Sequence, residues 1–352
     1  MTAPFTYESH ATRVVFGPGV ADTLASELER MGATRAVVLA TPNHEHAATQ
    51  IATQLGSRAR GVIATARMHV PVEVAAAAAR RARELDADCT IGYGGGSTIG
   101  LGKAIALELG LPQIAIPTTY AGSEMTTIWG LTDQGTKRTG RDARVLPKVV
   151  LYDPRLTIGL SPRVTAASGL NAMAHAVEAL YSTGANPVTT VLAEEAARAL
   201  ASALPRAVAN GADLAARGDA LYGAYLAGHA LGSVPMALHH QLCHLLGGTF
   251  DLPHAELHAL VLPHVVRFNA ASAPDAIVRL GRALGAGDPA ASLRANLDAL
   301  ALPTSLEVLG VPRDGLAAIA ARVAASPYPN PRPIVETEVA ALLAEIYTGR
   351  LS

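Results

Sequence analysis

Four histidines that lie close together in the second half of the chain are the first residues to suggest chemistry. His239 and His240 are adjacent, and the spacing of four between His240 and His244 puts those two on one face of a helix. His254 follows ten residues after His244. Imidazole titrates near neutrality and is a common metal ligand. The group therefore predicts a proton-transfer site or a metal centre.

Asn171 and His175 repeat the spacing of four further upstream. Three histidines together with one oxygen ligand are a donor set that can hold a divalent metal. Core or helix-surface histidines are the alternative interpretation, and it fits His175 taken alone. It fits the group less well, because adjacent helical residues point about 100° apart, so that a core position for both His239 and His240 is awkward.

A glycine-rich loop follows the apolar run 89–93 and precedes a helical pattern. Its residues are Gly94, Gly95, Gly96 and Ser97. Glycines let backbone N–H groups close around an anion, and the amino terminus of the helix adds unpaired donors and a favourable dipole. The pattern predicts a site for the pyrophosphate of a dinucleotide. A tight strand-to-helix turn without a ligand is the alternative, since glycine loops are weak evidence in isolation.

Polar residues follow two other predicted strands. Thr118, Thr119 and Ser123 come after one strand, and Thr41 comes after another. Because parallel strands bind ligands at their carboxyl ends, we expect these side chains to help hold the dinucleotide. An enzyme selective for NAD often has an acidic residue where Thr41 stands, to hold the ribose 2′-hydroxyl. Without that carboxylate a 2′-phosphate is not repelled, so we expect both NADH and NADPH to be used.

These residues are carried by two kinds of sequence pattern. Up to about Asp153, short β-branched runs alternate with helical patterns, as in βαβ units with a mostly parallel sheet. The predicted strands are 36–40, 60–63, 89–93, 113–116 and 148–151, and the predicted helices are 20–31, 72–85 and 98–109. From Thr157 onward, Ala- and Leu-rich helical patterns dominate, among them 189–203, 215–232, 290–300 and 337–347. We therefore expect an α/β amino-terminal dinucleotide-binding domain, residues 1–155, and an all-α carboxyl-terminal catalytic domain, residues 156–352.

Composition excludes several classes of protein. Of the 352 residues 50% are hydrophobic, which is enough for two cores. The 28 basic and 29 acidic residues give a formal net charge of −1 and form no long run, so we expect neither a nucleic-acid partner nor a membrane partner. The two cysteines, Cys89 and Cys243, lie in apolar segments, as in reduced proteins. With no signal-peptide pattern and no apolar stretch of about 18 residues, we expect a cytoplasmic protein.

Taken in order, these segments resemble the iron-containing alcohol dehydrogenase superfamily, which has a dehydroquinate synthase-like fold. The resemblance runs from Val15–Gly19 to 262–265 and includes the glycine loop. Within the superfamily the sequence is most similar to the maleylacetate reductase family, on segments 118–126, 128–130, 169–175 and 328–333. The resemblance implies reduction of maleylacetate, a small dicarboxylate, to 3-oxoadipate with NADH or NADPH in the breakdown of aromatic compounds. It also implies a homodimer.

One position departs from the metal-using relatives. They carry aspartate where this sequence has Asn171, followed by histidines that match His175, His240 and His254. A neutral amide lacks the charge that offsets the dehydration of a divalent cation. Because asparagine also suits the maleylacetate reductases, we expect that a divalent metal is not required.

The resemblance and the residue chemistry together suggest catalytic roles. Hydride addition beside a ketone leaves an enolate whose oxygen must be stabilised. We expect His240 or His244 to polarise the ketone and the other of the two, or Tyr328, to relay the proton. His175 and His254 would orient that group or bind a carboxylate.

Asn171, His239 and Arg332 are the predicted substrate contacts, Arg332 because a guanidinium can bind a carboxylate bidentately. Two other functions stay open. One is a metal-dependent alcohol dehydrogenase on the same fold, using iron or zinc. The other is a nucleotide-binding protein without catalysis. A lyase related to dehydroquinate synthase is disfavoured, because the motif details resemble the dehydrogenase branch.

Overall fold

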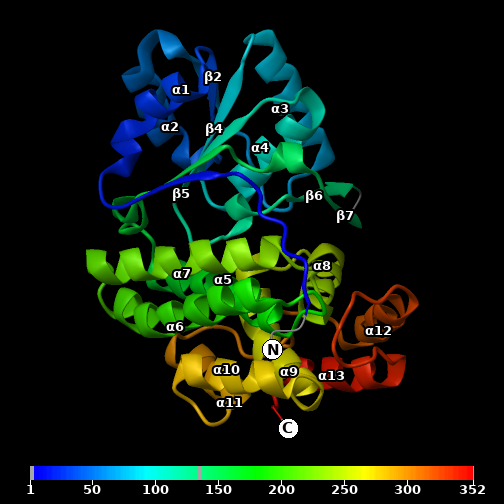
Figure 1. The fold of residues 1–352 in the computed structure, drawn as a ribbon. Coiled ribbons are helices and arrows are strands. Elements are labelled where there is room, and N and C mark those ends of the chain that lie inside the picture. Colours follow the sequence, from blue (N-terminus) through cyan, green and yellow to red (C-terminus); the bar gives the residue numbers. More distant parts are fainter. Residues whose placement is uncertain (1–3, 134–135, 352) are drawn as a thin grey trace. The chain divides into compact units, whose positions relative to one another are not determined.

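The computed structural model describes residues 4–133 and 136–351 (Figure 1). The chain forms two compact units. Ser9–Gly159 make up the α/β unit, and Leu160–Ser352 make up the helical unit together with the segment before Ser9. Within that segment the Tyr7 hydroxyl lies 3.0 Å from Nε2 of His229 in the helical unit. The chain thus passes from one unit to the other shortly after the predicted boundary at 155–156.

The α/β unit contains a six-stranded parallel sheet in the order β1-β8-β5-β4-β2-β3. Its strands are β1 Arg13–Phe16, β2 Ala36–Leu39, β3 Ala59–Ile63, β4 Cys89–Gly94, β5 Gln113–Pro117 and β8 Val149–Tyr152. Two further strands, β6 Ile128–Asp133 and β7 Thr136–Arg141, form a separate antiparallel hairpin. Apart from β1, the strand order is that of a doubly wound sheet, in which the direction of winding reverses between β2 and β4.

Helices cover both faces of this sheet. They are α1 Leu24–Met31, α2 Glu45–Leu55, α3 Val72–Glu84 and α4 Gly96–Leu109. Ala36 and Val38 of β2 share a core with α1 and α2, whereas Val37 and Leu39 share a core with α3 and α4. Figure 1 shows the two pairs of helices on opposite sides of the sheet. Strands buried on both faces must be apolar throughout, which explains why these runs were visible in the sequence.

The helical unit consists of helices α5 to α13, and no strand occurs among its described residues. The helices are α5 Pro162–Tyr181, α6 Pro187–Ala209, α7 Leu214–Gly232, α8 Leu238–Phe250, α9 His254–Asn269, α10 Pro274–Leu284, α11 Pro289–Ala299, α12 Leu316–Ala325 and α13 Glu336–Thr348. α5 is buried along all of Thr165–Tyr181, against α6, α7 and α9. Polar residues of α5 must therefore find their partners inside the helical core.

The predicted fold class, an α/β unit followed by a helical one, is confirmed. The five predicted strands and the seven predicted helical segments all correspond to elements of the structure. The sequence analysis missed β1, α2 and the β6–β7 hairpin. β1 is a four-residue strand at the edge of the sheet, and α2 has only two buried residues, so neither has a strong hydrophobic period.

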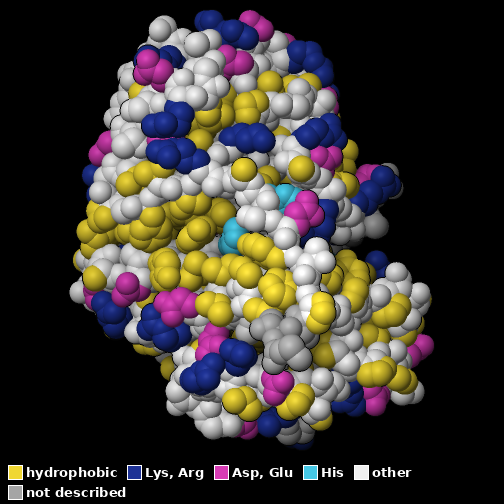
Figure 2. Space-filling model, viewed as in Figure 1, with side chains coloured by type: hydrophobic (Ala, Val, Ile, Leu, Met, Phe, Trp, Pro, Cys, Tyr) yellow, Lys and Arg dark blue, Asp and Glu magenta, His cyan; other side chains and the backbone are white. Residues whose placement is uncertain are grey.

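One face of the molecule shows how its charged side chains are distributed. Figure 2 shows Lys and Arg side chains scattered among Asp and Glu on the visible face, without a single basic tract. Among the described helices, none combines the length and the apolar character that crossing a bilayer requires.

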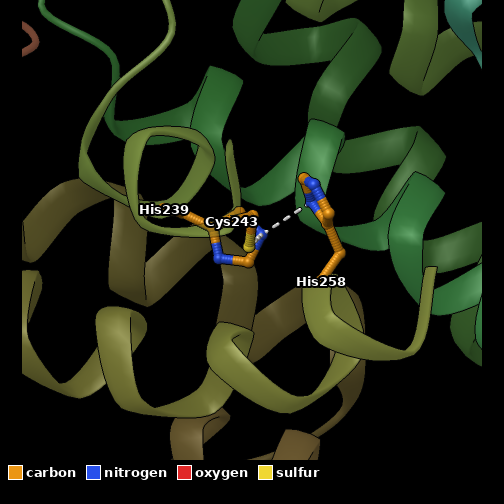
Figure 3. A group of neighbouring side chains, drawn as sticks. All are labelled: His239, Cys243 and His258. Carbon is orange, nitrogen blue, oxygen red and sulfur yellow. Dashed lines mark hydrogen bonds between the residues drawn. The ribbon is translucent and has the colours of Figure 1, made fainter. Parts of the chain in front are cut away.

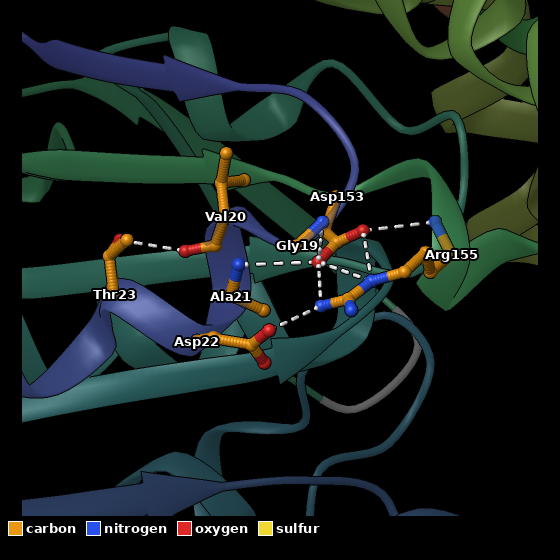
Figure 4. Close-up of polar contacts among 7 residues, drawn as sticks. All are labelled: Gly19, Val20, Ala21, Asp22, Thr23, Asp153 and Arg155. Atoms are coloured by element: carbon orange, nitrogen blue, oxygen red, sulfur yellow. Dashed lines mark hydrogen bonds and ion pairs between the residues drawn. The ribbon is translucent and has the colours of Figure 1, made fainter.

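A buried carboxylate joins two strand ends of the α/β unit (Figure 4). Asp153 follows β8 and accepts hydrogen bonds from the backbone N–H of Gly19 at 3.0 Å and of Ala21 at 3.2 Å, in the turn after β1. The Arg155 guanidinium adds a contact of 2.9 Å. Burial alone would raise the pKa of Asp153, but the hydrogen bonds from Arg155, Gly19 and Ala21 outweigh it and hold the pKa below the ordinary value of 3.8.

We expect Asp153→Asn to lower the free energy of unfolding of the α/β unit by about 1–3 kcal/mol, because the amide loses charge-assisted hydrogen bonds and leaves donors unpaired. Since the pKa is depressed in the folded state, this stabilisation is present above the unfolded-state pKa and is lost as the pH falls through the folded-state value. Urea unfolding followed by circular dichroism at several pH values measures both effects. The difference between wild type and variant should shrink below about pH 4.

Asp22→Asn is the matched control. Asp22 pairs with the same guanidinium at 3.0 Å, but its side chain is 76% exposed. An exposed pair of this kind contributes at most about 1 kcal/mol. Equal losses in the two variants, or a difference that does not change with pH, would contradict the role given to Asp153.

Candidate active site

A cluster of histidines lies inside the helical unit, contributed by α5, α8 and α9. Its members are His175 from α5, His239, His240 and His244 from α8, and His254 and His258 from α9. The rings of His175 and His240 are stacked with centroids 5.3 Å apart, and the ring of His244 lies 5.9 Å from that of His240. The ring of His258 is 5.0 Å from that of His240 and 4.3 Å from that of His254. The structure thus brings all the predicted histidines into one cluster.

One carboxylate is buried in the histidine cluster. Glu178 stands three residues after His175 on α5, and its side chain is fully buried. Its Oε2 accepts a hydrogen bond from Nδ1 of His240, and its Oε1 accepts one from the His240 backbone N–H at 3.3 Å. Burial alone would raise the pKa of Glu178, but the charge and hydrogen bond of His240 outweigh it and hold the pKa below the ordinary value of 4.5.

An ionised carboxylate can only accept hydrogen bonds. Nδ1 of His240 therefore carries the shared proton, and Nε2 is the nitrogen left for another partner. A carboxylate behind an imidazole in this way is common where the other nitrogen binds a metal or transfers a proton. The geometry of Glu178 and His240 suits either chemistry.

Burial sets the charge of three other rings. Desolvation, followed by the effect of neighbouring imidazoles, lowers the pKa of His175 and of His258 well below the ordinary value of 6.5. The same causes lower the pKa of His239 to about 3. These rings are neutral near pH 7, so they offer hydrogen-bond donors and nitrogen lone pairs rather than positive charge.

Several buried polar atoms of the histidine cluster and its surroundings have no hydrogen-bond partner among the described residues. They are Asn171 Oδ1, His175 Nδ1, His239 Nδ1 and His258 Nε2. An unsatisfied buried group costs about 1–3 kcal/mol, and in native proteins such a group usually meets a water, an ion or a ligand. Asn171 lies one turn before His175 on the same face of α5. Their free atoms identify a place where a further group fits.

The remaining predicted residues of the helical unit are placed differently. The backbone N–H of Tyr328 donates to Oε1 of Gln241 at 3.0 Å, so Tyr328 lies beside α8. His239 is completely buried, with Nε2 3.0 Å from Nδ1 of His258. Its predicted contact with substrate, like the roles of the other cluster residues, stays a prediction.

Arg332 is not brought to the histidine cluster. Its guanidinium lies 4.1 Å over the ring of Phe268, donates to the Phe268 carbonyl at 3.2 Å and pairs with Glu338 at 2.9 Å. Phe268 and His254 stand near opposite ends of α9, about 21 Å apart at the helical rise of 1.5 Å per residue. Arg332 thus joins α9 to α13, and its placement lends no support to the predicted contact with a substrate carboxylate.

Sequence analysis assigns no role to two members of this site. His258 follows His254 by four residues, so the spacing that identified the other pairs occurs here as well. Glu178 stands three residues after His175, and a carboxylate in the apolar segment 172–180 signals a buried charge that needs a partner. Neither the partner of Glu178 nor the central place of His258 could be read from spacing alone.

The predicted dinucleotide residues gather at one edge of the α/β sheet. Thr41 stands two residues after the end of β2. Gly94–Ser97 include the last residue of β4 and the first residues of α4. The backbone N–H of Thr118, after β5, donates to the Gly94 carbonyl at 3.1 Å. Since β2 and β4 are neighbours at the point where the winding reverses, these loops stand where doubly wound sheets bind ligands.

The glycine loop packs too tightly for side chains at two positions. Gly94 has a φ of +150°, and a Cβ there would lie 2.5 Å from Oγ1 of Thr98. A Cβ at Gly95 would lie 2.8 Å from Oγ1 of Thr119. Helix α4 begins at Gly96, two residues earlier than predicted, and no side chain caps its first turn. Backbone N–H groups are thus available for an anion.

A buried lysine supports the neighbouring loop, and sequence analysis missed it. Lys103 of α4 is 1% exposed, and its Nζ donates to the carbonyls of Thr126 and Ile128, each at 2.7 Å. In the same loop Glu124 accepts a hydrogen bond from the Tyr152 hydroxyl at 2.8 Å. Burial lowers the pKa of Lys103 to about 7 and raises that of Glu124. A lysine inside an apolar helix was the signal available in the sequence.

Comparison with known protein families gives two matches that together span most of the chain. Residues 11–154 match the model described as iron-containing alcohol dehydrogenase. Residues 165–347 match the model of the carboxyl-terminal part of the Fe-containing alcohol dehydrogenase family. The two matched segments correspond to the α/β unit and to the helical unit.

Individual relatives are similar over nearly their whole length. The chain is 54% identical to a maleylacetate reductase of Burkholderia cepacia and 53% identical to one of Sphingobium indicum, with 98% of each chain covered in both comparisons. Among solved structures, the maleylacetate reductase of Agrobacterium tumefaciens matches with a TM-score of 0.94 at 46% identity, covering 99% of this chain and 100% of that one.

We expect Gly95→Ala to weaken NADH binding about tenfold or more, because the added Cβ displaces Thr119 from the glycine loop. Overpacking of this kind costs about 1–3 kcal/mol, and 1.4 kcal/mol corresponds to tenfold in a dissociation constant. Titration followed by NADH fluorescence gives the constant. Gly287→Ala is the control, because a Cβ there meets no atom within 4 Å. If Gly95→Ala binds as tightly as wild type, the loop does not hold the nucleotide.

Proposed function

The chain belongs to the iron-containing alcohol dehydrogenase family, and within it to the maleylacetate reductases; from this premise we propose that it reduces maleylacetate to 3-oxoadipate with NADH or NADPH in the breakdown of aromatic compounds. The observation that carries the proposal is the 54% identity to a maleylacetate reductase across 98% of both chains. The glycine loop and the histidine cluster support it, because they supply the two things that a nicotinamide-dependent reductase needs, a nucleotide site and a proton-transfer site.

The reaction sets two requirements. Maleylacetate carries two carboxylates and a carbon–carbon double bond conjugated to a ketone. Hydride from the dihydronicotinamide adds to the carbon β to that ketone, and the displaced electron pair moves to the ketone oxygen as an enolate. The α-carbon then takes a proton, so that one NADH and one proton yield 3-oxoadipate and NAD⁺. The protein must stabilise the enolate oxygen and deliver that proton.

His240 is suited to both requirements. Glu178 holds its Nδ1–H and its backbone N–H, so the direction of Nε2 is fixed. A proton taken up at Nε2 makes an imidazolium that the buried carboxylate stabilises, and that proton can pass to the enolate. His244, whose ring lies 5.9 Å from that of His240, and Tyr328 are the alternative relays. The ring of His175 is stacked on that of His240, with centroids 5.3 Å apart.

The nucleotide is proposed to bind along Thr41, the glycine loop, Thr118, Thr119 and Ser123. No acidic side chain stands at Thr41, whose hydroxyl instead lies 2.9 Å from Nδ1 of His44. This arrangement favours use of both NADH and NADPH, because nothing there repels a 2′-phosphate. A preference of a hundredfold or more for either nucleotide would contradict it.

The family implies a divalent metal, and the residues present fit one. Asn171 Oδ1 and His175 Nδ1 are buried without a described partner, and Nδ1 of His240 is held by a carboxylate, as is usual for a metal-binding imidazole. His175, His240 and His254 with Asn171 would hold the cation. When bound, it would act as a Lewis acid towards the ketone oxygen. The prediction that no metal is required therefore gains no support from the site.

The fit of these donors also favours the second candidate function, a metal-dependent alcohol dehydrogenase. The deciding experiment follows NADH oxidation with maleylacetate by chelator-treated protein, then after addition of Fe²⁺ or Zn²⁺, and repeats both with simple alcohols and NAD⁺. Turnover of maleylacetate is expected, with 3-oxoadipate as product. Turnover of alcohols alone would favour the second candidate, and no turnover of any substrate would leave only nucleotide binding.

We expect His244→Ala to reduce kcat by about 10²-fold or more if its ring relays the proton, which is the usual contribution of a positioned acid or base. The dissociation constant for NADH should stay the same, because the nucleotide site belongs to other residues. Stopped-flow turnover and fluorescence titration measure the two quantities. His46→Ala, an exposed histidine of α2, is the control. Near-normal turnover of His244→Ala removes His244 from the mechanism.

Chain association is a separate question. The resemblance implies a homodimer, and sedimentation equilibrium of the purified protein would give the mass of the particle directly.

A further inference from the structure

Three side chains of the helical unit combine nitrogen and sulfur donors at short range. Figure 3 shows His239 and Cys243 on α8 turned toward His258 on α9. Nε2 of His239 lies 3.0 Å from Nδ1 of His258 and 3.7 Å from Sγ of Cys243. The donor atoms of all three residues lie within 4.8 Å of one another. We call these three residues the His–Cys–His trio.

The trio is a buried arrangement rather than a chance surface encounter. His239 and His258 are fully buried and Cys243 is 1% exposed. His239 and Cys243 are four residues apart, which places both on one face of α8, and His258 comes from the packed neighbouring helix. None of the three belongs to the donor set that the family implies, which is Asn171, His175, His240 and His254.

The distances approach those of a tetrahedral metal site. With metal–nitrogen bonds of about 2.05 Å and a metal–sulfur bond of about 2.3 Å, two nitrogens stand about 3.3 Å apart, and nitrogen and sulfur about 3.6 Å apart. The corresponding separations in the trio are 3.0 Å and 3.7 Å. The third separation, between the donor atoms of His258 and Cys243, is at most 4.8 Å, so a shift of about 1 Å or less would close the trio around a metal.

We propose that His239, Cys243 and His258 form a second cation site, separate from the donor set of the family, for a thiophilic divalent metal such as Zn²⁺. Imidazole and thiolate select zinc and similar ions over Mg²⁺ or Ca²⁺, which prefer oxygen ligands. On binding, the Cys243 thiol gives up its proton to solvent and its sulfur lone pair bonds to the metal, with no change in oxidation state. The proton shared between Nε2 of His239 and Nδ1 of His258 moves to the other nitrogen of its ring, so that both ligand nitrogens offer a lone pair.

A metal bound to the His–Cys–His trio would affect the charge balance of the helical core and the packing of α8 on α9. The thiolate and the nearby Glu178 carboxylate, which acts electrostatically on His239, together offset the two positive charges of the ion. A bound metal would also join α8 to α9, the two helices that carry His240, His244 and His254. The alternative is a hydrogen-bonded trio that takes no metal and serves only to pack α8 on α9.

Cobalt is the probe that separates these possibilities. A cysteine thiolate bound to Co²⁺ gives an intense charge-transfer absorption in the near ultraviolet, which nitrogen and oxygen ligands do not give. We expect this band when the chelator-treated full chain is equilibrated with Co²⁺ by dialysis. Cys243→Ser should abolish this band. Cys89→Ser is the matched control, because Cys89 is also buried but lies in the α/β unit, and it should retain the band.

His254→Ala separates the two donor sets. It removes a ligand of the set that the family implies, so the near-ultraviolet band should persist at full intensity while any cobalt held by that set is lost. Wild-type protein that binds no Co²⁺, that binds it without the band, or whose band survives Cys243→Ser overturns the proposal.

X-ray absorption spectroscopy of the zinc-loaded wild type needs no variant. We expect one sulfur neighbour at about 2.3 Å in addition to nitrogen neighbours at about 2.0–2.1 Å. Only the zinc that is held by the trio should have a sulfur neighbour. A first shell that contains only nitrogen and oxygen contradicts the second site.

Discussion

Burial of the Glu178 carboxylate is the constraint on which the helical unit depends. A carboxylate inside a packed helical core must be matched by donors, and His240 supplies two of them, its ring Nδ1–H and its backbone N–H. Removing one partner of a buried pair costs about 3–5 kcal/mol, because the other is left uncompensated. The pair therefore joins α5 to α8, and it sets the orientation of the ring that is best suited to transfer a proton.

Burial of the rings themselves sets the charge of the histidine cluster. With the rings of His175, His239 and His258 neutral, Glu178 contributes a negative charge that an anionic substrate would meet unfavourably. A cation bound among the imidazoles, held either by the donors of the family or by the His–Cys–His trio, would offset this buried charge. The α/β unit meets a different constraint, since its glycine loop must approach Thr98 and Thr119 more closely than any side chain permits.

Most of the fold could be predicted from the sequence, because strands buried on both faces and amphipathic helices leave clear hydrophobic periods. The glycine loop and the histidine spacings are equally local signals. Glu178, His258 and Lys103 could not be given a role from the sequence, because their significance comes from partners 62, 19 and 23 residues away in the chain. Arg332 is a different case, because its placement lends no support to the predicted contact. A guanidinium among prolines suggested a carboxylate ligand, but the fold gives it Glu338 and the ring of Phe268, at the far end of α9 from His254.

The central claim is that an ionised Glu178 holds the proton of His240 on Nδ1 and leaves Nε2 for chemistry. Nitrogen-15 NMR of protein labelled at histidine reports the protonation of each ring nitrogen, and His240→Gln identifies the resonances by their loss. A directly bonded proton on Nδ1 of His240 throughout the pH range of activity is expected. A His240 ring that carries its proton only on Nε2, with Nδ1 bare, would contradict the claim.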